Sequence, residues 1–548
     1  MEKNKYLLLG SSVGVLLLLI VAAQESFRKP WRQVQASGRG EDGEIAVRLR
    51  QITNANLRVG DRCVSCHVSM APGEQSVTGA AILAAHKPVV HDPAEYGCTV
   101  CHGGQGSATE KADAHGAVHF WPEPMIPLRF AEAGCGTCHT ALQVPNRELF
   151  QRARQTVDRL DCIACHRIDG RGGTIRPGGG RTEGPDLSHV GIAGYDKGWY
   201  EKHQAHAAKE SAGPWKTSFG KIDDADLEFI GIYLATRVSA PALIEAKATF
   251  HSFGCLGCHR VSGAGGDEGP DLSRAGEKDP GQADFTNVAE GAGLDRWIAE
   301  HFRSPVAVVA TSQMPPVAAS QKEIDLLTLY VLSLRRRELP GAYVPRDQMQ
   351  VTRFGQREFA PDGATLFGAF CAGCHGPEGA GKHASGGATF PAIANPDFLG
   401  VVNDQFLTET IRRGRPGRRM PGWAKDGGLR DEEIARIVEH LRKLGGAGPP
   451  ADDNWRASSK PETGRGIYAA NCSGCHGAKG EGGKGPALNN RAFLEIATDT
   501  YLMETVSRGR RGTAMAGYRE PSPTRRALAK SEMESTVAFI RDWQKEKK

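Results

Sequence analysis

The sequence has no cysteine outside one repeated pattern. All 14 cysteines of the 548-residue chain fall into seven Cys-x-x-Cys pairs, and each pair is followed directly by histidine. Because no cysteine is left over, the chain has neither a disulfide framework nor a spare thiol nucleophile. The pairs are Cys63 and Cys66, Cys98 and Cys101, Cys135 and Cys138, Cys162 and Cys165, Cys255 and Cys258, Cys371 and Cys374, and Cys472 and Cys475.

Long apolar runs are scarce as well. Aromatic residues make up 7% of the chain and its mean hydropathy is −0.39. Only residues 6–23 form an apolar run of membrane-spanning type, which excludes a bundle of transmembrane helices. Lys3 and Lys5 precede this run, so we expect an N-terminal anchor (1–24) that leaves the rest of the chain in the periplasm. Removal of the same segment as a signal peptide is the alternative.

The repeated Cys-x-x-Cys-His pattern is the attachment motif of c-type haem. Two thiols bind the haem vinyl groups, and the histidine ligates the iron from the proximal side. Zinc half-sites and thioredoxin-like pairs do not require that histidine. We therefore predict seven covalently bound haem c groups. Haem carboxylates would offset the formal charge of +5, so no nucleic-acid partner is predicted. The proximal ligands are His67, His102, His139, His166, His259, His375 and His476.

The spacing of the motifs divides the chain. Three motifs lie within residues 25–147, too close together for three separate cytochrome folds, whereas the other four are spread over the remaining chain. We predict a mostly α-helical protein with extensive loops: a transmembrane helix, a compact trihaem segment, and four tandem cytochrome c-like domains. The domains span 148–238, 239–340, 355–446 and 458–548, and an amphipathic helix closes each one. The segments between Pro340 and Pro361 and between Gly445 and Asp453 are predicted linkers, either hinges or simple spacers.

Extra histidines accompany the first three motifs. Four of them lie within 34 residues, and imidazole is the usual sixth iron ligand in packed multihaem segments, so we expect at least three to be distal ligands. The candidates are His86, His91, His115 and His119.

The first part of the chain resembles a known bacterial family. The motif surroundings Gly60–His67 and Gly97–Gly106, together with Trp31–Gln35, are similar to membrane-anchored multihaem cytochromes c that accompany cytochrome b subunits in quinol-oxidising, bc-type complexes. The resemblance covers roughly residues 25–340. It implies a membrane-bound donor, a cytochrome b-type quinol-oxidising subunit, and a soluble or oxidase-bound cytochrome as acceptor.

The last two domains are an internal repeat with an offset of 95 residues. Met420 and Met515 each stand six residues after a matching glycine, and we predict both as sixth iron ligands. Met314 lies in a sequence that resembles the methionine loop of monohaem cytochromes c, which makes it the ligand opposite His259. The same resemblance implies that the carbonyls of Pro185, Pro270, Pro391 and Pro486 hold the proximal imidazoles.

The haem at His166 has no methionine available, because none occurs between residues 126 and 313. His206 is the favoured sixth ligand, and His203 is the other local histidine. A histidine from the trihaem segment, Lys209, or an open position are the alternatives.

These ligand sets predict an electron relay without catalytic residues. Neutral thioether ligands raise the haem potential relative to imidazole, so electrons would run from low-potential N-terminal haems to high-potential C-terminal haems. The alternatives are a reductase of a small molecule such as nitrite or peroxide at an open iron above His166, and a wire to an external acceptor.

Overall fold

The computed structural model describes residues 2–40, 43–70, 77, 81–86, 89–119, 121–140, 142–173, 184–193, 198, 202, 222–289, 291, 293–383, 389–450 and 455–545. Regular structure in these residues is mostly helical, and the strands are two or three residues long. The strands pair as antiparallel hairpins: β1 with β2, β3 with β4, β5 with β6, β7 with β8, and β9 with β10. The predicted mostly α-helical fold with extensive loops is confirmed.

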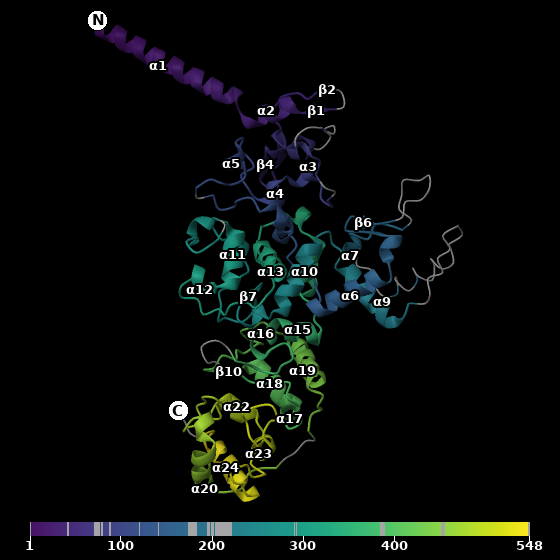
Figure 1. Cartoon of the computed structure of the whole chain (residues 1–548), viewed down its shortest axis with the longest axis vertical. Coiled ribbons are helices and arrows are strands. Elements are labelled where there is room, and N and C mark those ends of the chain that lie inside the picture. Colours follow the sequence, from purple (N-terminus) through teal and green to yellow (C-terminus); the bar gives the residue numbers. More distant parts are fainter. Residues whose placement is uncertain are drawn as a thin grey trace.

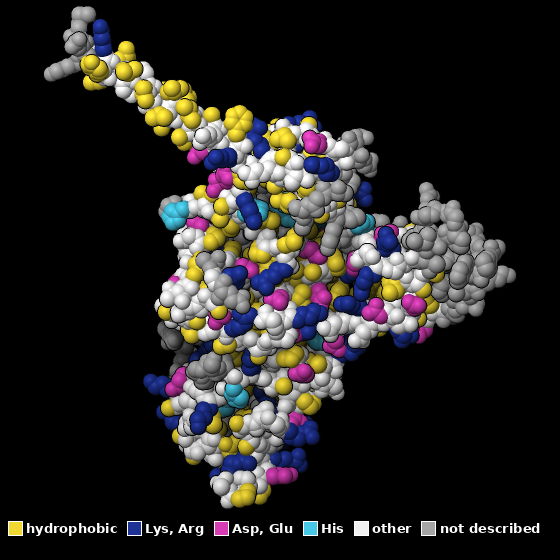
Figure 2. Space-filling model, turned by 45° about the horizontal axis from the view of Figure 1, so that its top comes forward, with side chains coloured by type: hydrophobic (Ala, Val, Ile, Leu, Met, Phe, Trp, Pro, Cys, Tyr) yellow, Lys and Arg dark blue, Asp and Glu magenta, His cyan; other side chains and the backbone are white. Residues whose placement is uncertain are grey.

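Helix α1 (Glu2–Phe27) projects from one end of the molecule (Figure 1). Its residues Asn4–Phe27 have a mean hydropathy of 2.4, and the apolar part is not buried at all. A helix of this length rises about 36 Å, enough for a bilayer core of about 30 Å. Among the described residues it is the one helix long and apolar enough to cross a membrane. Figure 2 shows hydrophobic side chains along it.

The trihaem segment follows α1 and contains only short elements. Arg32, on the first helix after the anchor, stacks on Phe27 and Trp31, with 5.6 and 4.7 Å from its guanidinium carbon to the ring centroids. The elements are α2 (Pro30–Ser37), β1 (Arg39–Gly40), β2 (Gly43–Glu44), β3 (Ile52–Asn54), β4 (Val59–Asp61), η1 (Cys63–Ser65), η2 (Val68–Met70), η3 (Ala81–Leu83), α3 (Pro93–Tyr96), α4 (Thr99–His102), α5 (Lys111–Ala114) and η4 (Leu128–Thr137).

Four pairs of packed helices make up the rest. In each pair one helix leads into a Cys-x-x-Cys-His motif and the other is the predicted closing helix: α6 (Arg147–Arg159) with α9 (Asp224–Ala235), α10 (Pro241–Ser252) with α13 (Gln321–Ser333), α15 (Gly363–Phe370) with α19 (Asp431–Gly445), and α20 (Pro461–Asn471) with α24 (Lys530–Asp542). The predicted apolar stripes of the closing helices are buried, including Leu227, Leu327, Ile437 and Val537.

Shorter elements build the loops around each pair. They are η5 (Cys162–Ala164), β5 (Arg167–Ile168), β6 (Arg171–Gly172), α7 (Val190–Ala193), η6 (Cys255–Gly257), β7 (Arg260–Val261), β8 (Ala264–Gly265), η7 (Ala275–Glu277), η8 (Pro280–Gln282), α11 (Leu294–Arg303), α12 (Pro305–Val308), η9 (Gly341–Tyr343), α14 (Arg346–Phe354), α16 (Ala372–His375), β9 (Lys382–His383), β10 (Thr389–Phe390), α17 (Pro396–Leu399), α18 (Asp404–Arg413), α21 (Ser473–His476), α22 (Arg491–Ile496) and α23 (Asp499–Arg508).

The parts are arranged along one axis with a side branch. From the N-terminal helix, the trihaem segment, the α10–α13 unit, the α15–α19 unit and the α20–α24 unit follow one another, while α6, α7 and α9 lie to one side (Figure 1). One apolar core cluster runs along the axis from Ile126 to Ile540, and the side branch has a core of its own around Val157 and Ile230.

The segment between Pro340 and Pro361 is packed rather than a loose linker. It contains α14, and Phe359 is buried and forms a bridge with Val144. Of the two predicted roles, hinge or spacer, the burial of Phe359 favours a spacer for this segment.

Candidate haem-binding sites

The four C-terminal motifs hold their histidines in the same way. In each, the histidine Nδ1 lies within hydrogen-bonding distance of the predicted proline carbonyl: His166 and Pro185 at 2.8 Å, His259 and Pro270 at 3.0 Å, His375 and Pro391 at 2.9 Å, and His476 and Pro486 at 2.8 Å. These four hydrogen bonds confirm the predicted contacts between the proline carbonyls and the motif histidines. An Nδ1–H that donates to a carbonyl leaves the Nε2 lone pair for a metal ion.

Glycine precedes three of these prolines because the imidazole packs directly on it. A Cβ atom at Gly184, Gly269 or Gly485 would lie 2.6, 2.5 or 2.9 Å from the Cε1 atom of the neighbouring histidine. Such contacts are too short for any side chain. In the remaining motif Phe390 takes the place of glycine, and its ring stands at 75° to His375 with 6.3 Å between centroids.

In the trihaem segment the extra histidines lie opposite the motif histidines. The ring centroids of His86 and His102 are 6.1 Å apart, and those of His91 and His139 are 6.0 Å apart. His115 lies near His67: burial lowers the pKa of His67, and the charge of His115 lowers it further. His119 is exposed, and none of these three pairings involves it.

The two measured ring spacings fit an iron ion between the rings. Two imidazoles on opposite sides of one metal have centroids about 6.3 Å apart, because the metal–nitrogen bond is about 2.0 Å and a ring nitrogen lies about 1.15 Å from its centroid. The residues present therefore fit haem with two axial histidines.

His139 has an acidic partner that the sequence did not reveal. Its Nδ1 lies 3.0 Å from Asp347 Oδ1, and the neighbouring Gln348 donates a hydrogen bond to the Cys138 carbonyl. Both partners belong to α14, 208 residues away from His139 in the case of Asp347. No local pattern could have linked residues so far apart in the chain.

Asp61 fixes the second motif from the first. Its side chain is 1% exposed and accepts hydrogen bonds from the Cys98 and Thr99 N–H groups at 2.6 and 2.8 Å, and from the Thr99 hydroxyl at 2.8 Å. Because Asp61 stands two residues before Cys63, this carboxylate joins the two attachment motifs.

Neighbouring motifs touch one another in two further places. The side chains of Cys63 and Cys98 are neighbours, and so are those of Cys258 and Cys374. A Cβ atom on Gly134 would meet the Cys101 carbonyl, and one on Gly254 would lie 2.2 Å from the Gly373 nitrogen. The backbones of the second and third motifs, and of the fifth and sixth, are therefore in direct contact.

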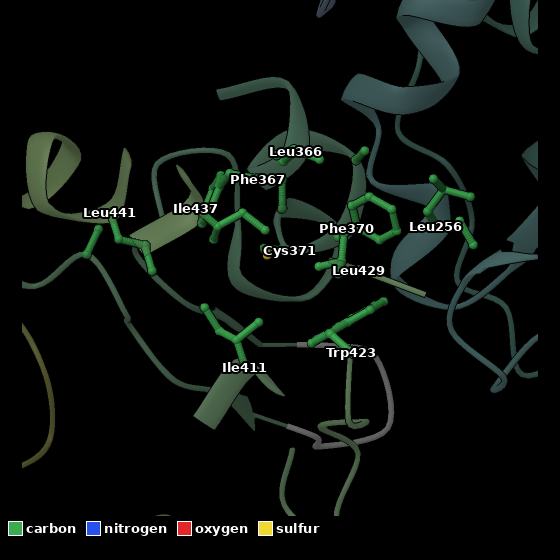
Figure 3. Close-up of a cluster of buried hydrophobic side chains, with 14 of the residues drawn as sticks. Leu256, Leu366, Phe367, Phe370, Cys371, Ile411, Trp423, Leu429, Ile437 and Leu441 are labelled. Atoms are coloured by element: carbon green, nitrogen blue, oxygen red, sulfur yellow. The ribbon is translucent and has the colours of Figure 1, made fainter. Parts of the chain in front are cut away.

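The predicted methionine ligands of the last two domains lie in equivalent loops. The Met420 carbonyl accepts a hydrogen bond from the Arg415 N–H, and the Met515 carbonyl accepts one from the Arg510 N–H, both at 2.8 Å. Met503 is instead buried in α23 as part of the core. In the α15–α19 unit, apolar side chains that include Phe367, Ile411 and Trp423 surround Cys371 (Figure 3).

Met314 has a competitor for the position opposite His259. His301, on α11, stacks on Trp297 with 5.2 Å between centroids and 13° between planes. Its Nδ1 is buried without a hydrogen-bond partner among the described residues. Burial lowers the pKa of His301, and the charge of His259 lowers it further, so the two imidazoles are close. Met314 is half-buried against the core.

The structure does not describe the local candidates for the sixth iron ligand at His166. His203, His206 and Lys209 lie outside the described residues.

Known proteins show similarity to the C-terminal part of the chain. Residues 244–335 match the family Cytochrome c, and residues 358–441 and 459–530 match the family described as cytochrome C oxidase, cbb3-type, subunit III. Cytochrome c domains bind haem c covalently, so the chain is a multihaem c-type cytochrome, a protein of electron transfer.

Curated proteins that are similar to this chain include subunits of cbb3-type cytochrome c oxidases. The cbb3-type cytochrome c oxidase subunit FixP of Bradyrhizobium diazoefficiens is 36% identical over 180 residues, 30% of this chain and 58% of FixP. The corresponding subunit CcoP of an Azospirillum species is 31% identical over 172 residues, 28% of this chain and 54% of CcoP. The chain thus spans just over half the length of these relatives. It is related to subunits of oxidase and bc-type complexes.

Proposed function

We propose that the protein is a heptahaem electron relay that accepts electrons at its N-terminal, membrane-proximal end and delivers them at its C-terminal end. The order of the attachment motifs along the long axis carries this proposal (Figure 1). When bound, each haem supplies one iron that holds an electron as Fe(II) and releases it as Fe(III).

Contacts between motifs support a continuous route. The first motif touches the second through Cys63 and Cys98, and the second touches the third through Gly134. The third motif meets the α10–α13 unit, where a Cβ atom on Gly136 would lie 2.2 Å from the Ser333 carbonyl oxygen. Because each step places two attachment motifs or their scaffolds in contact, no long gap separates the first three sites from the fifth.

The route continues through the last three units. Cys258 and Cys374 bring the fifth and sixth motifs together. The α15–α19 and α20–α24 units then pack against each other through α18 and α22. The unit that contains His166 lies beside this axis rather than on it (Figure 1).

The ligands assigned to each haem set the direction. We assign three pairs of axial histidines in the trihaem segment: His67 with His115, His102 with His86, and His139 with His91. We assign Met420 and Met515 opposite His375 and His476, and Met314 opposite His259. Imidazole stabilises the ferric state more than thioether does, so electrons move downhill from the trihaem segment to the C-terminal units.

Partners follow from the similarities. A cytochrome b-type, quinol-oxidising membrane subunit is the proposed donor, and a cytochrome or an oxidase subunit is the proposed acceptor. The α1 helix would anchor the chain in the cytoplasmic membrane with its body in the periplasm, where c-type haem is attached. No catalytic residue is assigned.

Haem counting and a redox titration test the proposal. We expect seven haems per chain in the purified holoprotein and a titration that separates into a low-potential and a high-potential group. M420H should move one haem out of the high group by on the order of 100 mV, within the roughly 0.8 V range that axial ligands control.

M503L is the matched control, because Met503 is a core residue of the neighbouring α23 helix. It should leave every potential in place. Fewer than seven haems, or a titration without two groups, would overturn the relay as proposed here.

A further inference from the structure

The interface between the α15–α19 and α20–α24 units is symmetric. Asn395 Nδ2 donates to the Arg511 carbonyl at 2.9 Å, and Asn490 Nδ2 donates to the Pro416 carbonyl at 3.1 Å. Asn490 follows Asn395 by 95 residues, and Arg511 follows Pro416 by 95 residues, so the two contacts are equivalent in the repeat. The two units therefore pack through the same surface, as two subunits of a twofold homodimer do.

Four aromatic rings form the centre of this interface. Phe398 and Phe406 come from the first unit, and Phe493 and Tyr501 are their counterparts in the second. The centroids of Phe398 and Tyr501 are 6.2 Å apart, those of Phe406 and Phe493 are 6.0 Å apart, and those of Phe406 and Tyr501 are 5.1 Å apart. The cluster is apolar, and all four side chains are buried.

One arginine from each unit enters this cluster. The Arg415 guanidinium lies 5.4 Å from Phe406 and 5.6 Å from Phe493. Its counterpart Arg510 lies 5.9 Å from Tyr501 and 4.7 Å from Phe398. Each arginine thus lies near one ring of its own unit and one ring of the other.

Neither arginine has an acidic partner among the described residues. Arg415 donates to the Thr410 hydroxyl and Arg510 to the Tyr501 hydroxyl, both at 2.7 Å. Burial lowers the pKa of Arg415 to about 10, and the Arg510 Nε is buried without a hydrogen-bond partner.

Two other partly buried arginines of these units are paired with carboxylates, whereas Arg525 lies 4.2 Å from the Tyr518 ring centroid. Arg357 contacts Glu433 at 2.9 Å, and Arg541 contacts Asp499 at 2.5 Å. A buried cation without an anion is costly, and contact with aromatic faces offsets about 0.5–2 kcal/mol of that cost. Among the described residues, Arg415 and Arg510 therefore each lack the negatively charged partner that a buried guanidinium needs.

Both arginines are attached to the predicted haem ligands. The Arg415 N–H donates to the Met420 carbonyl and the Arg510 N–H to the Met515 carbonyl. Both arginines therefore lie in the loops that carry the predicted methionine ligands.

We infer that Arg415 and Arg510 bind the propionate carboxylates of the haems at His375 and His476, and so hold the two haem edges at the interface. The inference rests on the proposed function, which supplies the two haems. A guanidinium is suited to this role because its fork of N–H donors matches a carboxylate. Each arginine would also stabilise the ferrous form of the neighbouring haem through its positive charge.

Redox titration of the full-length holoprotein tests the inference. R415M and R510M should each lower the midpoint potential of one high-potential haem by about 59 mV, which is a tenfold change in its one-electron redox equilibrium. R415K and R510K keep the charge and should recover most of that shift. A role limited to packing would not distinguish lysine from methionine in this way.

R413M is the control, because Arg413 crosses the same interface to Glu495 at 2.8 Å. It should leave both midpoints unchanged. Equal shifts in R413M, R415M and R510M, or no shift in any of them, would overturn the inference. If a methionine variant is recovered without its haem, redox titration of R415Q and R510Q tests the inference instead, with the same expected lowering of one midpoint potential. Absence of haem from the peptides of Cys371 and Cys472 in the parent protein would instead overturn the proposed function.

Discussion

The trihaem segment and the two C-terminal units bring haem sites together by different means. In the trihaem segment the buried apolar residues up to Val100 form small clusters, such as Leu57, Val59 and Val100, and only its last part, from Ile126, joins the large core. Hydrogen bonds that Asp61 accepts and contacts between motif backbones join its sites. In the C-terminal units, packed helices form a continuous apolar core, and a symmetric interface joins them.

This difference shows where each region obtains its apolar interior. The C-terminal units bury whole helical faces, for example Ile434, Ile437 and Leu441 of α19. The trihaem segment has no comparable helix among its described residues, so under the proposed function its haems would supply much of the core. We therefore expect the trihaem segment to depend more strongly on haem for its order than the C-terminal units do.

The largest expected effect comes from removing one haem attachment from each region. C98S/C101S should increase the rate of proteolysis within residues 25–147 about a hundredfold, equivalent to about 2.8 kcal/mol, because proteolysis tracks the population of open states. C472S/C475S should increase cleavage of its own unit by a much smaller factor. Limited proteolysis followed by mass spectrometry measures both rates.

The outcome decides whether the comparison holds. Equal protease sensitivity of the two variants would mean that the helical units need their haem as much as the trihaem segment does. Haem content, measured on both variants, confirms that each lost one haem only.

A moderate effect is expected at the junction between the regions. Asp347 lies 3.0 Å from the His139 Nδ1, and a carboxylate there makes the imidazole a stronger donor to iron and stabilises the ferric state. D347N should raise the midpoint potential of that haem by about 59 mV, which is a tenfold change in its one-electron redox equilibrium. Redox titration measures the shift.

D404N provides the control for that experiment. Asp404 forms a 2.8 Å ion pair with Arg442 in the α15–α19 unit, far from the trihaem segment along the chain. A downward shift in D347N, or the same shift in D404N, would exclude the carboxylate as a tuning partner of His139.

The smallest effect is expected at the rim of the symmetric interface. Asp397 and Arg511 form an ion pair at 2.7 Å, and Arg511 lowers the pKa of Asp397. Because Arg511 is 84% exposed, solvent screens the pair, and D397N should lower the free energy of unfolding of these units only slightly. The contribution is complete above the unfolded pKa of about 3.9 and disappears as the pH falls through the lower folded value.

Urea unfolding of D397N, R511M and the double variant at neutral pH measures this pair. A double variant much more stable than the two single losses predict by addition would show that the rim, rather than the aromatic centre, holds the two units together.

Local sequence was sufficient for the features that depend on neighbouring residues. The Cys-x-x-Cys-His spacing and the amphipathic periods predicted the attachment motifs and the buried faces of all four closing helices, since both are local patterns. The proline carbonyls were predictable from the resemblance to monohaem cytochromes c, and each lies within 19 residues of its histidine. The offset of 95 residues revealed the repeat itself.

Tertiary structure alone decided the features that join distant residues. Asp347 reaches His139 across 208 residues, and His301 approaches His259 from a separate helix. The segment from Pro340 to Pro361, predicted as a linker, is packed because Phe359 finds a buried place beside Phe370 and His251. The repeat predicted two similar domains, but only their packing placed Arg415 and Arg510 in one apolar interface. Such contacts depend on how separate units meet in space, and no local pattern in the chain encodes that meeting.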